Sequence, residues 1–151
     1  MRFLTLVLLF SGGALAEENN SRARLGVGVL LGEPTGFSAE LEFDRTHSLD
    51  AALSYSLVEG ELHVHSDYLL KLNDLGTKHK YGRFVPYFGL GAQLALGSRN
   101  DGGLSVRFPV GMINLFSKHP LGLFFELVPG MAIVPETRLV MGAGLGIRFY
   151  F

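Results

Sequence analysis

The chain has 151 residues, of which 48% are hydrophobic and 18% are charged. This length is enough for one domain with a single core and gives no reason to expect a second one. The formal net charge is −1, and no run of lysine or arginine forms the basic stripe that a phosphate backbone requires, so we expect no nucleic-acid partner. Because cysteine is absent, disulfides and thiolate metal sites are excluded.

The N-terminal segment has the pattern of a secretion signal. Arg2 supplies the positive charge, residues 3–10 form an apolar run, and Ala14-Leu15-Ala16 forms a small-x-small cleavage site. A membrane-spanning helix needs about 20 apolar residues, and this run is broken at Ser11. We therefore predict a signal peptide over residues 1–16 that is cleaved after Sec-type export, followed by a flexible polar tail over residues 17–23.

Residues 24–151 show apolar side chains at every second position, which is the period of a β-strand. The last strand is the clearest, because apolar residues from Leu139 to Phe151 alternate with glycines, Arg148 and Tyr150. The same alternation predicts strands over residues 25–31, 37–43, 49–55, 62–70, 84–96, 104–111, 121–134 and 139–151. Eight is an even number, as closed bacterial outer-membrane barrels require.

Short turn-forming segments separate the predicted strands, and the longest link is Asn73 to Gly82. Regular hairpins indicate an antiparallel up-and-down meander and exclude parallel α/β folds, which need long crossover connections. Pro86, Pro109 and Pro129 each remove a backbone donor from a predicted strand, so we expect bulges or strand ends at these three positions.

The second face of the predicted strands consists mainly of glycine, serine and alanine instead of the charged residues that coat a soluble sheet. Side chains just fill the lumen of an eight-stranded barrel, so small inner residues leave room for larger ones such as Arg148 and Tyr150. This pattern predicts an apolar face in contact with lipid. The alternative is a soluble lipocalin-like barrel in the periplasm, in which the apolar face lines a ligand cavity.

Four segments carry a resemblance to a known family: residues 32–36 (GEPTG), 107–111 (RFPVG), 125–130 (FELVPG) and 146–151 (GIRFYF). With these segments the chain resembles the small eight-stranded outer-membrane barrels of the OmpA transmembrane-domain and OmpX kind. The resemblance implies an all-β, eight-stranded antiparallel up-and-down transmembrane β-barrel over residues 24–151, surrounded by outer-membrane lipids. It also implies that the barrel-assembly machinery recognises the final strand through Leu145, Ile147, Phe149 and Phe151.

Charged residues fall on the predicted inner face. The acids Glu40, Glu42, Asp50, Asp67 and Glu126 are expected to pair with Arg107 and Arg148, because charges in a narrow lumen need partners. We interpret this lumen charge network as a structural polar core. The alternative is a gated narrow channel in which such ion pairs form the plug.

His63, His65 and Asp67 lie at alternate positions of one strand, a spacing that can converge on a metal ion. No second strand with further ligands is evident from the sequence, so inward hydrogen-bonding residues are the preferred interpretation and no metal or cofactor is expected. An enzyme is not expected either, because alternation places Ser66 and His65 on opposite faces of the strand.

With residue 151 on the periplasmic side, residues 32–36, 57–60, 97–103 and 135–138 form short outer loops, which offer little surface for adhesion. We therefore expect an integral outer-membrane protein with a structural or envelope-scaffolding role and no open pore. The alternative is a barrel that binds a small apolar or lipid ligand in its mouth. Basic residues of the periplasmic turns are expected to contact the cell-wall polymer or anionic lipid, namely Arg45, Lys78, Lys80 and Lys118.

Overall fold

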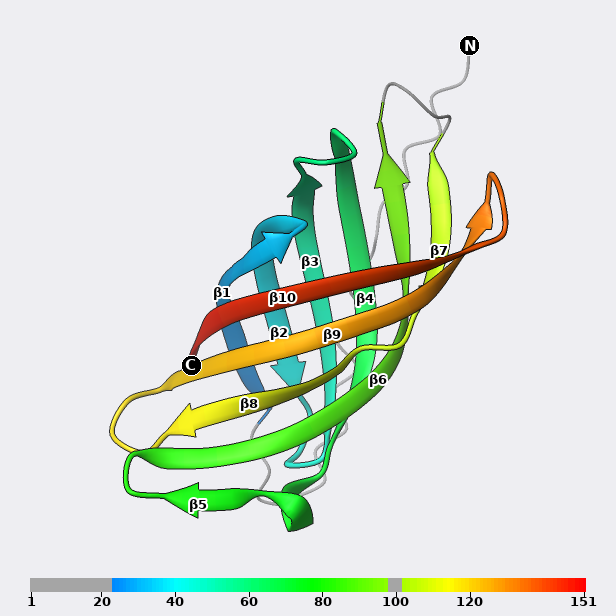
Figure 1. The fold of residues 1–151 in the computed structure, drawn as a ribbon. Helices are drawn as coiled ribbons and strands as arrows, with labels where there is room; N and C mark the ends of the chain where they lie inside the picture. The colour runs from blue at the N-terminus through cyan, green and yellow to red at the C-terminus, as the bar shows by residue number, and fades with distance from the viewer. Residues whose placement is uncertain (1–22, 98–101) are drawn as a thin grey trace, which may run out of the picture.

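The computed structural model describes residues 23–97 and 102–151. The predicted signal peptide, most of the predicted tail and residues 98–101 of one predicted outer loop lie outside the described residues. The described residues form one antiparallel sheet that closes on itself (Figure 1). Its strands are β1 (Arg24–Glu33), β2 (Thr35–Glu42), β3 (His47–Ser56), β4 (Glu61–Lys71), β5 (Thr77–His79), β6 (Gly82–Leu96), β7 (Gly103–Arg107), β8 (Val110–Phe116), β9 (Leu121–Val134) and β10 (Arg138–Tyr150).

The sheet closes through the first and last strands, because β10 pairs with both β1 and β9. Strands β7 and β8 together occupy one position between β6 and β9, and the short β5 only extends one edge of β6. Eight positions therefore surround the lumen, and β9 and β10 cross the front of the barrel obliquely in Figure 1. The predicted fold class, an eight-stranded antiparallel up-and-down barrel, is confirmed.

The interruption between β7 and β8 is caused by prolines. On β6 the register is the same on both sides of the gap, since Gly91 faces Arg107 and Phe88 faces Val110. Pro109 lies in the gap itself, and Pro129 of β9 accepts a bond from Phe108 across it (2.9 Å). Neither proline has an N–H to donate, so the ladder is broken without a change of register. The strand ends expected at Pro109 are confirmed, whereas Pro86 and Pro129 lie inside the continuous strands β6 and β9, so the expectation is wrong at these two positions.

Two segments differ from the sequence prediction. The link expected over residues 73–82 contains a 3-10 turn, η1 (Asn73–Leu75), followed by β5, which pairs with β6. The strand predicted to end at residue 111 continues to Phe116. Alternation fails there because Ile113 faces the lumen although it is apolar, so both faces of β8 are apolar. No helix in the described part of the chain is long and apolar enough to cross a membrane.

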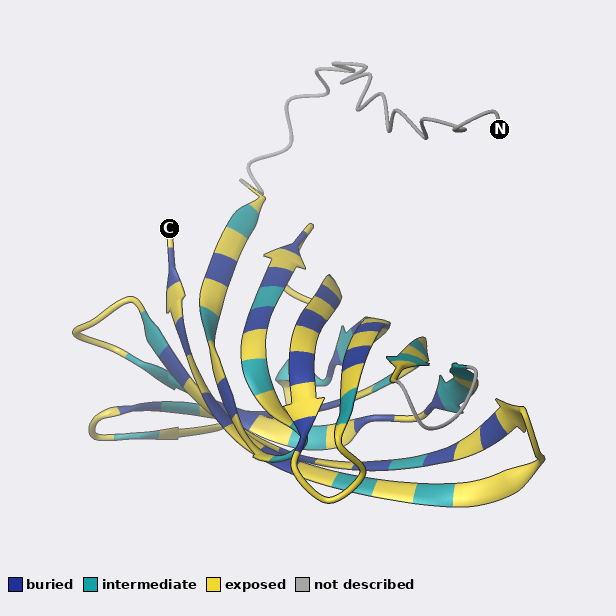
Figure 2. Ribbon diagram, turned by 90° about the horizontal axis from the view of Figure 1, so that it is seen from above, coloured by how far each residue is buried: buried dark blue, intermediate teal, exposed yellow. Residues whose placement is uncertain are grey.

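Burial alternates along the strands, as the banding in Figure 2 shows. The outward apolar side chains are exposed over the whole circumference, for example Phe37 of β2 (71%) and Met141 of β10 (73%). This arrangement is the reverse of a soluble lipocalin-like barrel, and it matches a surface that meets lipid.

Inside, glycines make room for aromatic rings. A Cβ on Gly26 would lie 2.6 Å from the ring of Tyr150, and one on Gly122 would lie 2.9 Å from that ring and from Ile113. The predicted role of the inner glycines as spacers is confirmed at these positions. The rings and aliphatic side chains that they admit form a buried apolar cluster in the lumen, made of Leu30, Leu69, Val85, Tyr87, Ile113, Phe124 and Tyr150.

Candidate functional site

The most unusual part of the lumen is a line of three acidic residues on neighbouring strands. Glu40 of β2 faces Asp50 of β3, and Asp50 faces Asp67 of β4 in the strand register. All three are buried, and like charges directly opposite each other destabilise a sheet. We call Glu40, Asp50 and Asp67 the acidic row. Its stability depends on cations that reach it from other strands.

Arg148 of β10 reaches the acidic row from one side. Its guanidinium donates to Glu40 (3.1 Å), to Asp50 and to the hydroxyl of Ser38 (2.8 Å). Its charged carbon also lies 4.1 Å from the centre of the Phe124 ring, a cation–π distance. The hydroxyl of Tyr150 donates to Glu40 (2.7 Å) above Gly26, the glycine that lies between them in the register.

Arg107 of β7 reaches the row from the other side. Gly91 lies between Arg107 and Asp67 in the register, and its missing side chain lets the guanidinium extend over β6. The Nε of Arg107 donates to both oxygens of Asp67 (3.1 Å each), and an outer nitrogen lies 3.9 Å from Glu126. Tyr87 donates to the other oxygen of Glu126 (3.0 Å). The structure thus places the residues of the predicted lumen charge network in the interior, and both arginines have acidic partners there.

One member of the network is not in the sequence prediction. Lys71, at the end of β4, is buried and forms ion pairs with Glu40 (2.7 Å) and Glu42. Glu42 also pairs with Arg24 at the mouth of the barrel (2.6 Å). The signal in the sequence is the position of Lys71, four residues after Asp67 and therefore on the same face of the strand.

The predicted metal candidates His63, His65 and Asp67 do not form one group. His65 and Asp67 lie with Asp50, and their ligand atoms are within 4.8 Å of one another. His63 lies instead with Glu59 and Glu61 near the mouth of the barrel that is predicted to face outside, which we call the outer mouth. The expectation that no second strand supplies a ligand is wrong in geometric terms, because Asp50 belongs to β3. The side chain of Ser66 is exposed on the outer face, away from His65.

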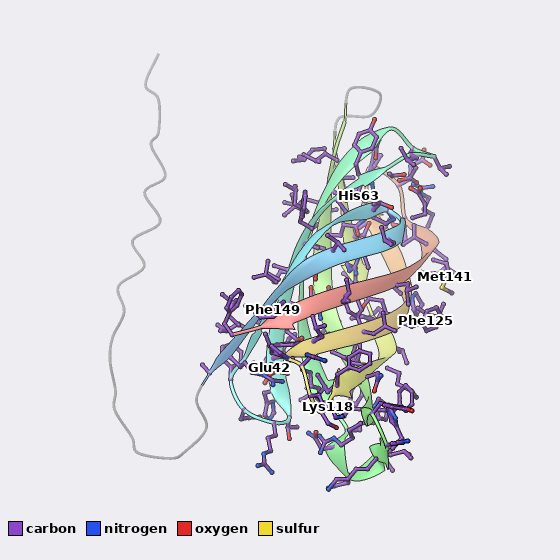
Figure 3. All side chains as sticks on the ribbon, turned by 90° about the vertical axis from the view of Figure 1, so that its left-hand side faces the viewer. Glu42, His63, Lys118, Phe125, Met141 and Phe149 are labelled. Carbon is purple, nitrogen blue, oxygen red and sulfur yellow. The ribbon has the colours of Figure 1, made fainter. Side chains whose placement is uncertain are left out.

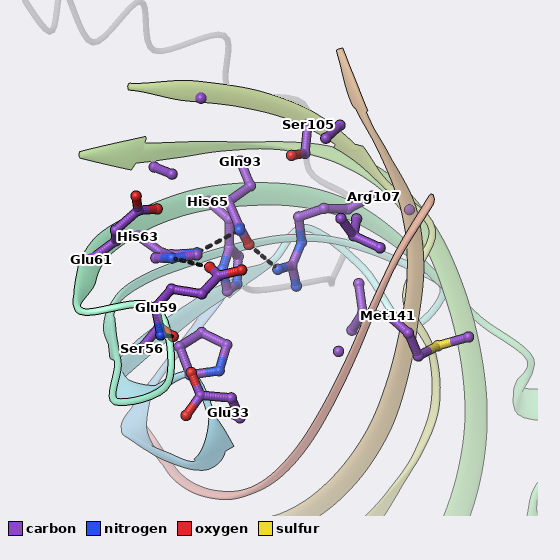
Figure 4. A pocket seen from close by; sticks show the side chains of 18 of the residues that line it. Glu33, Ser56, Glu59, Glu61, His63, His65, Gln93, Ser105, Arg107 and Met141 are labelled. Carbon is purple, nitrogen blue, oxygen red and sulfur yellow. Dashed lines mark hydrogen bonds and ion pairs between the residues drawn. The ribbon is translucent and has the colours of Figure 1, made fainter. Parts of the chain in front are cut away.

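Two cavities lie at the two ends of the lumen among the described residues. The outer one has a volume of about 330 Å³ and is open to the outer mouth, where His63, His65, Gln93 and Arg107 line its polar side (Figure 4). The inner one, about 730 Å³, lies among Arg24, Arg45, Lys71 and Arg83 at the other end, which is predicted to face the periplasm and which we call the periplasmic end. The acidic row with its arginines and the buried apolar cluster fill the space between the two cavities.

The inner cavity is bordered by a tight turn between β2 and β3. The backbone N–H groups of His47 (2.8 Å) and Thr46 (2.7 Å) donate to the carboxylate of Asp44 in this turn. These two hydrogen bonds favour the ionised form, so they lower the pKa of Asp44. The turn thus carries a negative charge beside the basic groups of the mouth.

Outside the lumen, the remaining predicted residues lie on the surface. Leu145, Ile147, Phe149 and Phe151 share the outer face of the last strand, and Figure 3 shows Phe149 near the periplasmic end of the barrel. Their role in assembly stays a prediction. The basic residues Arg45, Lys78, Lys80 and Lys118 are all exposed at the periplasmic end, where Figure 3 labels Lys118.

No protein-family model and no curated protein sequence matches the chain. A solved structure that is similar is the N-terminal β-barrel domain of OprF from Pseudomonas aeruginosa. The two have a TM-score of 0.59 and 15% sequence identity over 85% of this chain and 96% of the OprF domain. At this identity the likeness concerns the fold. The chain therefore has the fold of the small eight-stranded outer-membrane barrels.

Proposed function

We propose that the protein is an integral outer-membrane barrel with a structural role in the envelope, and that its lumen forms no open pore. The observation that supports this proposal is the filled layer between the two cavities. Side chains from all around the barrel meet there, because the buried apolar cluster joins residues of β1, β4, β6, β8, β9 and β10, and Arg148 of β10 reaches Asp50 of β3. A water-filled path through eight strands would have to displace these contacts.

Planar-bilayer conductance tests whether the lumen is closed. The wild-type protein is expected to be silent, and Arg107→Ala and Glu126→Ala test the gated channel directly because each removes one side of the Arg107–Glu126 pair. Silence in both variants supports the closed barrel. Steady conductance in either variant overturns it and supports a gated narrow channel.

The periplasmic end supports a role in attachment. Arg45, Lys78, Lys80 and Lys118 come from three connections and are exposed, whereas the described outer turns carry Glu33, Glu59 and Glu136, which Arg138 partly offsets. Exposed basic side chains near a membrane attract anionic groups, each with about 1 kcal/mol. We infer that this end contacts anionic groups of the cell-wall polymer or of phospholipids.

Two co-sedimentation experiments separate these two sources. The purified protein is mixed with isolated cell-wall polymer in one, and with vesicles that contain or lack an anionic phospholipid in the other. Replacement of the four basic residues by glutamine is expected to abolish binding to one of the two, and Arg138→Gln at the outer rim is the matched control. Binding that the fourfold variant retains in full contradicts the proposal.

The outer cavity supports a second candidate function, the binding of a small apolar or lipid ligand in the mouth. Its volume of about 330 Å³ lies at the lower end of the range for small-molecule sites, and part of its wall is apolar through Val128, Val134 and Val140. Displacement of a fluorescent fatty acid from the wild type, and its loss in Val128→Trp, would support this function. No binding by the wild type excludes it for this class of ligand.

A further inference from the structure

His65 is buried without a hydrogen-bond partner in the described part of the chain. Its exposed fraction is 4%, and Nδ1 has no partner. Its Nε2 is directed between two carboxylates, at 3.6 Å from Asp50 Oδ1 and 3.8 Å from Asp67 Oδ2. Both distances are too long for hydrogen bonds. Asp50 Oδ1 is itself buried and unpartnered. The buried imidazole of His65 and the buried Oδ1 of Asp50 thus face each other, and no hydrogen bond joins them.

The spacing of these atoms fits a shared ion better than direct contact. In a tetrahedral zinc site with nitrogen and oxygen ligands about 2.1 Å from the metal, neighbouring ligand atoms are about 3.4 Å apart. The two separations from His65 Nε2 exceed this value by a few tenths of an ångström, and all three ligand atoms lie within 4.8 Å of one another. Asp50 and Asp67 also face each other directly across β3 and β4, so a cation between them would relieve their repulsion.

The charge of the lumen also favours a further cation. Among the described residues, the buried carboxylates are Glu40, Glu42, Asp50, Asp67 and Glu126, whereas the buried cations are Lys71, Arg107 and Arg148, and the half-exposed Arg24 pairs with Glu42. Arg148 serves both Glu40 and Asp50, and Arg107 serves both Asp67 and Glu126. Each arginine is thus shared by two acids. The acids of this network thus outnumber the cations by one, and His65 lies beside two acids that share their arginines.

The contacts of both aspartates leave them able to bind an ion. Arg107 holds Asp67 and Arg148 holds Asp50 in place. A carboxylate has about four lone-pair positions, so each can accept these bonds and still ligate. Such outer contacts fix the orientation of metal ligands in known sites. His65 lines the outer cavity, which gives an ion and a water ligand a route from the outer mouth.

The neighbouring group of Glu59, Glu61 and His63 does not offer a histidine nitrogen that is free to bind a metal ion. Arg107 can only donate, so it fixes the Gln93 oxygen toward itself (2.7 Å), and the Gln93 amide must then donate to His63 Nδ1 (2.6 Å). The proton of His63 therefore lies on Nε2, which faces Glu59 at 3.4 Å. Figure 4 shows this chain of contacts from Arg107 to Glu59. Nδ1 of His63 thus accepts from Gln93, and the protonated Nε2 has no hydrogen-bond partner among the described residues, so neither nitrogen offers a free lone pair to a metal ion.

From these observations we propose that Asp50, His65 and Asp67 bind a divalent transition-metal ion, with Zn²⁺ as the test ion, beside the outer cavity that His65 lines. One nitrogen and two carboxylate oxygens suit zinc and its neighbours, whereas Ca²⁺ and Mg²⁺ prefer oxygen ligands alone. A water molecule from the cavity completes the coordination. The site goes beyond the structural role proposed above, because a barrel without metal would serve that role equally well.

Calorimetric titration with ZnCl₂ tests the site. The full chain is purified without a polyhistidine tag, treated with a chelator and titrated in detergent. Wild-type protein is expected to bind one ion, and Asp50→Asn and His65→Gln are expected to weaken binding by about tenfold or more. His63→Gln is the matched control, two residues away on the same strand and face, and its affinity is expected to be unchanged. The gel shift of folded barrels on heating verifies that each variant is folded.

Absence of heat with the wild type overturns the proposal and leaves the contacts of His65 with Asp50 and Asp67 as purely structural. Binding that persists in His65→Gln, or that disappears equally in His63→Gln, also overturns it. If the variants do not fold, Co²⁺ bound to the wild type decides the question. Intense visible absorption bands of a tetrahedral site support the proposal, and a weak octahedral spectrum contradicts it.

Discussion

Replacement of Arg148 by methionine removes the most deeply placed charge of the barrel and keeps an unbranched side chain of similar length. Arg148 is 2% exposed and pairs with both Glu40 and Asp50. When one partner of a buried ion pair is removed, the other charge stays buried without compensation, at a cost of about 3–5 kcal/mol. We therefore expect Arg148→Met to lower the free energy of unfolding by about 3–5 kcal/mol.

Urea unfolding of the protein in lipid vesicles, followed by the gel shift of the folded barrel, measures this loss. Arg138→Met is the matched control, because Arg138 is 65% exposed and lies 3.9 Å from Glu59, so the expected loss is at most about 1 kcal/mol. Combining Arg148→Met with Glu40→Gln and Asp50→Asn should recover most of the stability, since no uncompensated acid then remains at Arg148. Equal losses in Arg148→Met and Arg138→Met would refute the reasoning.

Three further predictions concern the packing, a turn and the topology. Gly122→Ala should cost about 1–3 kcal/mol by overpacking, whereas Gly142→Ala, whose added Cβ would lie 3.7 Å from its nearest neighbour, should be nearly neutral in the same unfolding assay. NMR titration of Asp44 should give a pKa below the usual value for aspartate. The hydrogen bonds of its carboxylate therefore stabilise the turn at any pH above the pKa of Asp44 in the unfolded chain, and this stabilisation is lost as the pH falls through its pKa in the folded protein. A titration midpoint at the usual value would contradict this. On intact cells, Val58→Cys should react with an impermeant thiol reagent and Lys78→Cys should not; the opposite result would invert the topology.

Most of the fold follows from the sequence, because a period of two directly reports which side chains share a face of a strand. The predicted strand 121–134 coincides with β9, and that over 84–96 lies within β6. The exception is β8. Its inner face carries the apolar Ile113, so both faces of this strand are apolar and the alternation cannot be recognised in the sequence. The hairpin of β5 with β6 is also missing from the pattern, because three residues are too few for an alternation to be recognised.

The candidate site is less predictable for a geometric reason. Alternation places Asp50, His65 and Asp67 inside, but it does not say which residue of one strand lies opposite which residue of the next. That depends on the register between the strands, which the turn of residues 57–60 sets. The pairing of Asp50 with Asp67, and the separation of His63 from His65 into two groups, become visible only with the register. Lys71 was hidden for another reason, since it is the last residue of its strand.

Arg148 also bears on how the barrel assembles. Its partners Ser38, Glu40 and Asp50 are 110, 108 and 98 residues away along the chain, across the seam between β1 and β10. In a sheet that has not closed, this guanidinium and the carboxylates of Glu40 and Asp50 cannot pair with one another. Unpaired charges inside a membrane cost a large amount of free energy. Closure of the last strand on the first therefore satisfies all three charges in one step. The ion pairs select against intermediates in which β10 is displaced or shifted in register, so the completed barrel is favoured over a ring that is left open.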